Sequence, residues 1–210
     1  MSLDPGPAAP AVPRTRLRRL LVALALVALL AAVLLFSADQ QATRDGRLDG
    51  LRRATELTAQ HRAGPVEYPG YPERPPMGGD HSGLPQQCGV YDAQVPTEHA
   101  VHSLEHGAVW ITYRPGLPEE DLAVLRRLTG SSTHRLLSPL PGQGPPIVLT
   151  AWGAQLDLPD ADDDRLEPFL AQFTRSPQSP EPGAPCQGNP RTGPLPFDPP
   201  GTEAPETTQA

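Results

Sequence analysis

The segment that decides the fold is TEHAVHSLEHGAVWITY, residues 97–113. Its first part predicts a short helix over residues 97–106, because Thr97 can cap the start of a helix and Gly107 is suited to end one. Its second part, residues 108–113, is short and rich in β-branched and aromatic side chains, which predicts a strand. A helix followed at once by a strand indicates a domain that mixes both kinds of element.

The residues that follow continue this mixture. Residues 118–128 predict a helix, with acidic residues in its first turn, arginines in its last turn and leucines along one face. Strands are predicted at residues 134–138 and 147–152, and another helix at residues 160–173. The order of these elements predicts a small α+β domain, in which two to three helices pack on one face of a short sheet.

A long apolar run precedes this domain. From Leu20 to Phe36 the chain holds seventeen residues without a polar side chain, and a helix of that length measures about 26 Å, the short end of what crosses a membrane. A cleavable signal peptide is the alternative, but cleavage after Ala38 would place bulky Phe36 where a small residue is required. The run therefore predicts a retained signal-anchor helix over residues 20–38 that crosses the membrane once.

The charges around this run predict its orientation. Four arginines lie just before it, and basic residues stay on the cytoplasmic side of a membrane. The chain is therefore expected in the cell membrane, with its N-terminus in the cytoplasm and its main domain outside. The predicted parts are a disordered cytoplasmic tail at residues 1–19, the anchor, a polar helical stalk at 39–63, an extracytoplasmic α+β domain at 64–188 and a disordered proline-rich tail at 189–210.

The net charge limits the partners. Residues 1–37 carry +3 and residues 38–210 carry −10, which accounts for the total of −7. An acidic outer part lacks the basic surface that nucleic acid attracts, so no nucleic-acid partner is expected. The expected partners are the membrane, through the single span, and an unidentified protein of the cell envelope.

Both cysteines, Cys88 and Cys186, follow the apolar run. Two thiols outside the membrane are normally oxidised, which predicts one disulfide. It would close a loop of roughly a hundred residues and stabilise the fold by about 4–5 kcal/mol in the chain-entropy model. Two free thiols, or metal ligation by Cys88, are the alternatives.

A cluster of histidines is the strongest chemical signal. If residues 97–106 are helical, His102 and His106 lie one turn apart on the same face, where two imidazoles can bind one metal ion at about 2.0–2.1 Å. Glu105 could bind the ion directly or orient a ligand, and His81 could supply a third nitrogen from a glycine-rich segment. The alternative is that these histidines form hydrogen bonds to backbone groups. His99 is expected to face solvent, and His61 and His134 are given no role in the site.

The same residues form His-x-x-Glu-His, the order of the inverted zinc-protease motif, in which the glutamate acts as general base. That motif belongs to a long helix, whereas Gly107 ends this one directly after His106. The chain contains no Gly-x-Ser-x-Gly elbow, phosphate-binding Gly-Lys loop or Cys-x-x-Cys pair, so serine-hydrolase, nucleotide-binding and thiol-redox functions lack support. The acidic residues 160–164 are better explained as the start of a helix than as a calcium loop.

Five short motifs together resemble the bacterial family called domain of unknown function 3105. They are PPMGGDH at 75–81, CGVY at 88–91, VHSLEHGAV at 101–109, AWG at 151–153 and EPGAPC at 181–186. The resemblance covers about residues 64–188 and implies the layout of a short tail, one anchor and one outer domain. It also implies that His81, His102, Glu105 and His106 occupy positions of the family pattern, and that Cys88 and Cys186 match a cysteine pair. It implies no activity.

The sequence thus predicts a membrane-anchored domain that binds copper or zinc through His81, His102 and His106, with Glu105 or Asp80 in support. Binding, sensing or delivery is expected rather than catalytic turnover. The main alternative is an interaction or scaffold domain of the cell envelope, whose histidines and glutamate form a buried hydrogen-bonded network. A zinc-dependent hydrolase is a more remote alternative. A metal site requires nitrogen donors that converge on one point, whereas a network requires each ring to be paired.

Overall fold

The computed structural model describes residues 14–45 and 48–188. The chain divides into two compact units, Met1–Gly46 and Arg47–Ala210. The predicted disorder of residues 1–13 and 189–210 lies outside the described residues.

The first unit contains a single described helix, α1, over Arg14–Asp45. The helix includes the predicted anchor at 20–38 and also residues 14–19, for which the sequence predicts part of a disordered tail. The large apolar side chains described between residues 21 and 34 are exposed in this unit, with Leu30 61% and Leu34 62% accessible. Among the residues that the structure describes, no helix combines the length and the apolar character needed to cross a membrane. The membrane anchor therefore stays a prediction.

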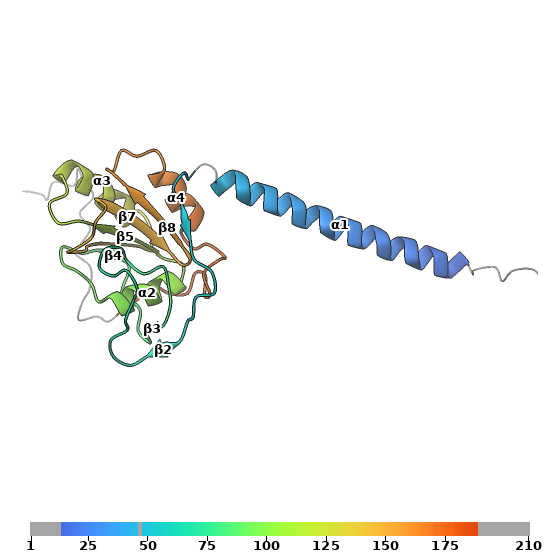
Figure 1. Ribbon diagram of the computed structural model, residues 1–210, viewed down its shortest axis with the longest axis horizontal. Helices are drawn as coiled ribbons and strands as arrows, with labels where there is room; N and C mark the ends of the chain where they lie inside the picture. The colour runs from blue at the N-terminus through green and yellow to red at the C-terminus, as the bar shows by residue number, and fades with distance from the viewer. Residues whose placement is uncertain (1–13, 46–47, 189–210) are drawn as a thin grey trace, which may run out of the picture. The chain divides into compact units, whose positions relative to one another are not determined.

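The second unit is an α+β domain built on a six-stranded mixed sheet (Figure 1). The strand order is β1-β8-β7-β5-β6-β4. Strands β4, β6 and β5 run parallel, whereas β7, β8 and β1 are added antiparallel. The bounds are β1 Arg52–Arg53, β4 Gly89–Val90, β5 Val109–Tyr113, β6 Arg135–Pro139, β7 Ile147–Ala151 and β8 Ala154–Leu158. Helix α3, Glu119–Gly130, makes the crossover that parallel β5 and β6 require.

Helices cover both faces of this sheet rather than the one face predicted. On one face, α3 and α4 (Leu166–Phe173) pack on Ile111 and Leu149 (Figure 1). On the other face, α2 (Thr97–Glu105) packs on Trp110 and Leu136. Every residue of β5 is buried. Its near-continuous run of apolar and aromatic residues, without alternation, is the pattern of a strand covered on both faces.

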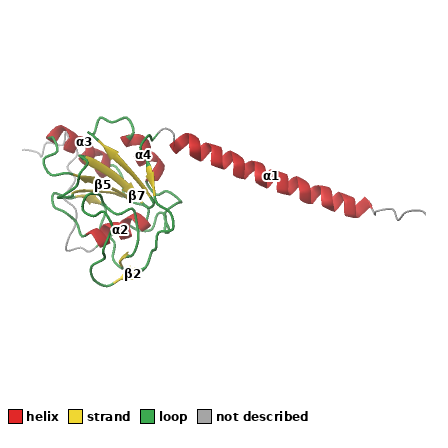
Figure 2. Ribbon diagram, viewed as in Figure 1, coloured by secondary structure: helices red, strands yellow, loops and turns green. Residues whose placement is uncertain are grey.

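The segment predicted as a stalk differs from that prediction. Helix α1 ends at Asp45. From Leu48 onward the described residues belong to the domain: Leu48 is 1% exposed, and β1 pairs with β8. Beyond it, β2, His61–Arg62, pairs in parallel with β3, His81–Ser82, in a small second sheet. The leucines here pack singly instead of forming a helix face: Leu48 lies within the main core cluster, Leu51 packs against that cluster and Leu57 packs against the second one. Loops make up much of this side of the domain (Figure 2).

Element boundaries differ locally from the predictions. Helix α2 begins at Thr97 without a side-chain cap. Helix α4 begins only at Leu166, because the acidic residues before it form turns in which Asp163 accepts hydrogen bonds from Arg165. Strand β8 was not predicted; Gly153, with φ +68°, closes a tight hairpin between β7 and β8. The predicted disulfide is present between Cys88 and Cys186, with a Cα–Cα distance of 5.4 Å.

Candidate metal centre

The candidate site lies where α2 meets the small β2–β3 sheet. Helix α2 carries His102 and Glu105, and β3 carries His81 at its first residue. The parallel register places His61 of β2 directly beside His81. Before His81, the chain makes a tight approach at Gly78, whose φ of +141° suits glycine and where a Cβ would lie 2.9–3.1 Å from Leu57 and Trp152.

Four side chains converge on one point. Ligand atoms of His61, His81, His102 and Glu105 all lie within 4.8 Å of one another. The Glu105 carboxylate oxygen Oε2 lies 2.9 Å from His81 Nε2, 3.5 Å from His61 Nε2 and 3.8 Å from His102 Nε2. Ligands around a tetrahedral zinc ion are separated by about 3.3 Å, given metal–ligand distances of 2.0–2.1 Å. The three distances from Oε2 bracket that value, and all ligand atoms of the group lie within 4.8 Å of one another, so an ion would fit between them after adjustment of the side chains.

The rings of His81, His102 and His106 are held in one tautomer by backbone carbonyls. His81 Nδ1 lies 2.7 Å from the oxygen of Gly79, and His102 Nδ1 lies 2.7 Å from the oxygen of Ser82. His106 Nδ1 lies 2.9 Å from the oxygen of Pro185. A carbonyl oxygen can only accept, so each Nδ1 carries the hydrogen, and in a neutral ring each Nε2 is left with a lone pair. Metal-binding histidines show this arrangement.

Two short contacts in the cluster bring these Nε2 atoms against another acceptor atom. His81 Nε2 faces the Glu105 carboxylate at 2.9 Å, and His102 Nε2 faces His106 Nε2 at 2.9 Å. With the hydrogens on Nδ1 and the rings neutral, both contacts bring electron pairs together. Each contact is favourable only if a proton or a metal ion contributes positive charge between the two atoms.

Burial shapes the charge state of the cluster. His81 is fully buried, and His102 and Glu105 are each 5% exposed. Desolvation lowers the pKa of His102, and the nearby rings of His106 and His81 lower it further, against the opposing effects of the Ser82 carbonyl and Glu105. His102 is therefore neutral at neutral pH, which is the form that binds a metal. His61 differs, since its side chain is 54% exposed and forms the solvent side of the cluster.

The structure brings together most of the residues predicted for the site. His81, His102 and Glu105 share one group, whereas His106 joins an adjoining group with Glu105 and Glu181. Asp80 lies outside both groups, and its carboxylate accepts a hydrogen bond from Arg62 at 2.7 Å. His61 was missed, because no spacing in the sequence relates it to the others; only the pairing of β2 with β3 does.

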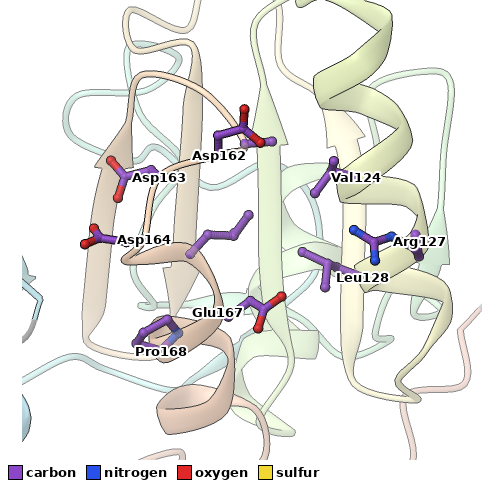
Figure 3. A pocket seen from close by; sticks show the side chains of 10 residues that line it. Val124, Arg127, Leu128, Asp162, Asp163, Asp164, Glu167 and Pro168 are labelled. Carbon is purple, nitrogen blue, oxygen red and sulfur yellow. The ribbon is translucent and has the colours of Figure 1, made fainter.

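Two other features are less suited to a metal. His134 is buried, but its Nε2 contacts the oxygen of Ala184 and its Nδ1 contacts Thr133. On the opposite face of the sheet a hollow between α3 and the start of α4 is lined by carboxylates and by Arg127 (Figure 3). Its Asp163 is held by Arg165. Within the described part of the chain, the metal-capable groups lie at α2 and not in this hollow.

A family model described as "Protein of unknown function (DUF3105)" matches residues 61–188. The chain belongs to this family. The match confirms the resemblance drawn from the motifs. Its range begins at His61 and includes both cysteines, so all residues of the cluster lie inside the family region. Comparison with curated proteins and with solved structures yields no match.

Motifs that are distant in the sequence of this family member meet around the cluster. The ring of Trp152, from the AWG motif, contacts the His81 ring edge to face, with centroids 5.9 Å apart. The Gly153 amide donates to the carbonyl of Met77 at 2.7 Å, which ties the AWG turn to the PPMGGDH segment. From the EPGAPC segment, Pro185 supplies the carbonyl that holds His106.

Proposed function

We propose that this domain binds a divalent transition-metal ion, with His81, His102 and Glu105 as buried ligands and His61 as a ligand on the solvent side. The observation that carries the proposal is the orientation of the histidines. Two buried rings donate Nδ1–H to carbonyls and direct Nε2 toward one carboxylate. A metal ion at that point would remove the repulsion between facing electron pairs and give the buried carboxylate a charged partner.

Zinc and copper(II) suit this donor set best. Imidazole nitrogen is a good ligand for both metals, and a single carboxylate is common in zinc sites. The exposed His61 leaves solvent access to the ion on one side. A site with a solvent-facing ligand can exchange its metal, which supports binding, sensing or delivery as the role.

We also propose that residues 20–38 anchor the protein in the cell membrane, with the domain outside the cytoplasm. The support is the apolar run without a polar side chain, the arginines before it and the exposed leucines and valines of α1. The disulfide supports an oxidising compartment for the domain. A protease added to intact cells with a permeable outer envelope tests this placement. Degradation of the domain before lysis would support it, whereas protection until lysis would refute it.

The second candidate function is a scaffold or interaction domain in which the cluster only stabilises the fold. One observation favours it: the bonds from His102 to the Ser82 carbonyl and from His106 to the Pro185 carbonyl join two surrounding segments to α2 and its C-terminal end. The structure gives less support to the zinc-hydrolase alternative, because the inverted motif requires both of its histidines to bind the same ion. Here His106 is grouped with Glu181 instead.

Metal analysis of the full-length chain, purified in mild detergent, tests the proposal. The parent should retain or take up at least one zinc or copper(II) ion per chain, bound tightly enough to survive gel filtration. A His81→Gln/His102→Gln variant should lose this binding. His99→Gln is the matched control, because His99 lies on the same helix outside the cluster. Absence of binding in the parent, or equal binding by both variants, would refute the assignment.

A further inference from the structure

A second group of potential ligands adjoins the first. Ligand atoms of Glu105, His106 and Glu181 lie within 4.8 Å of one another, and Glu105 belongs to both groups. We infer that a second divalent cation binds here, so that the centre holds two ions and the Glu105 carboxylate bridges them. This inference rests on the proposed metal-binding function and extends it from one ion to two.

His106 provides the independent observation. Its side chain is 10% exposed, and its Nδ1–H is committed to the carbonyl of Pro185. Its Nε2 lone pair points to His102 Nε2 at 2.9 Å and to a Glu181 carboxylate oxygen at 3.5 Å. His106 Nε2, His102 Nε2 and a Glu181 carboxylate oxygen therefore meet at one place, and a cation at this position would be coordinated by His106 and Glu181.

One ion cannot serve both groups as they stand. The four-residue group of His61, His81, His102 and Glu105 does not extend to Glu181. A carboxylate has two oxygens and can bind one ion with each, and the metals of two-metal sites are typically about 3.5–4 Å apart. The rings of His102 and His106 are perpendicular, at 90°, so each can direct its nitrogen to its own ion. Binding of two ions requires these nitrogens to move apart from their present separation of 2.9 Å.

The C-terminal segment places Glu181 at this position. The amide of Glu181 donates to the carbonyl of Glu105 at 3.0 Å, and the amide of Gly183 donates to the carbonyl of His106 at 3.0 Å. These bonds satisfy carbonyls at the end of α2 that would otherwise lack partners. The disulfide between Cys88 and Cys186 then fastens the segment a few residues further on. The second position is thus assembled from parts that are remote in the sequence.

Glu181 gives the second position an anionic ligand of its own. The first group contains one carboxylate, and Glu181 adds a second within reach of His106. A single divalent ion bound to the first group leaves the contact between His106 and Glu181 without a bridging charge. A second ion supplies that charge, with Glu181 as its own carboxylate ligand and Glu105 shared with the first ion.

Zinc stoichiometry in the full-length chain tests the inference. Native mass spectrometry combined with equilibrium dialysis should show two zinc ions on the parent, with different affinities. Glu181→Gln should weaken the second ion at least about tenfold and leave the first unchanged. Glu120→Gln, an exposed carboxylate on α3, removes the same charge far from the cluster and should keep both ions.

The outcomes separate the two proposals. A parent that saturates at one zinc ion, with Glu181→Gln indistinguishable from it, overturns the second site and leaves the first intact. A parent that binds no zinc overturns both. In cobalt(II)-loaded protein, magnetic coupling between two ions supports the bridge by Glu105, whereas two uncoupled ions overturn it.

Discussion

Replacing Glu105 with glutamine separates a metal site from a structural ion pair. The side chain is 5% exposed, and its carboxylate lies 2.9 Å from His81 Nε2. If His81 were an imidazolium paired with this carboxylate, the attraction at that distance would be about 6 kcal/mol with an effective dielectric constant of 20. Breaking such a buried pair by removing one partner costs about 3–5 kcal/mol after desolvation is taken into account.

The metal-site hypothesis predicts the opposite pattern for the Glu105→Gln variant. Without metal, the glutamine amide can donate to the His81 nitrogen lone pair, so stability should stay within about 1 kcal/mol of the parent. With metal, the loss of an anionic ligand should weaken binding by at least about 100-fold, the upper end of the effect of an outer-shell partner.

Thermal unfolding with a chelator, and again with zinc, measures both quantities. The parent should gain about 2.7 kcal/mol at a zinc concentration 100 times its Kd, and the variant should gain little at the same concentration. At roughly 3 °C per kcal/mol for a domain of this size, the two hypotheses differ by roughly 10 °C for the metal-free variant. A large loss of stability in chelator, with no zinc effect on the parent, would refute the metal-site reasoning.

Three further predictions concern the scaffold. Replacing both Cys88 and Cys186 with serine should lower the free energy of unfolding by about 4–5 kcal/mol, because the disulfide closes a loop between residues 98 positions apart. Denaturant unfolding measures this change, and an unchanged midpoint would contradict the prediction. Gly107→Ala should destabilise by about 1–3 kcal/mol, since φ is +87° and the new Cβ would lie 3.0 Å from backbone of the C-terminal segment. Gly116→Ala, with φ +92° and open space, is its control for backbone strain alone, and equal losses would show that the close contact is unimportant. Hydrogen bonds from the Arg165 guanidinium lower the pKa of Asp163 below 3.8. The Asp163 carboxylate therefore contributes to the free energy of unfolding above pH 3.8, and this contribution is lost as the pH falls through the lowered pKa. Asp163→Asn should make the free energy of unfolding less dependent on pH in this acid range, and an unchanged dependence would contradict the prediction.

Much of the fold could be predicted because its signals are local. Helix α2, strand β5 and helix α3 follow from residues near one another in the chain: the glycine at 107, the β-branched run at 108–113, and the charges at the two ends of 118–128. The disulfide also follows from the sequence, since only two cysteines are present. The two-residue strands β1 to β4 were not predicted, because they depend on partners and not on their own composition.

The site was predicted only in part for the same reason. The spacing of His102 and Glu105 in one helix is a local property, and the glycines before His81 mark a close approach of the backbone. His61 has no such signal, and it enters the cluster through its pairing with His81 across the small sheet. His106 is grouped with Glu105 and with Glu181, which the folded C-terminal segment brings to it.

The sequence by itself determined which residue types are available: imidazoles, a glutamate in a short helix, and two cysteines able to form a disulfide. The tertiary structure decided which nitrogen of each ring is free to bind. The carbonyls that receive the Nδ1 hydrogens belong to Gly79, Ser82 and Pro185. A backbone carbonyl is chemically the same at every residue, so no sequence pattern marks these three, and only folding selects them.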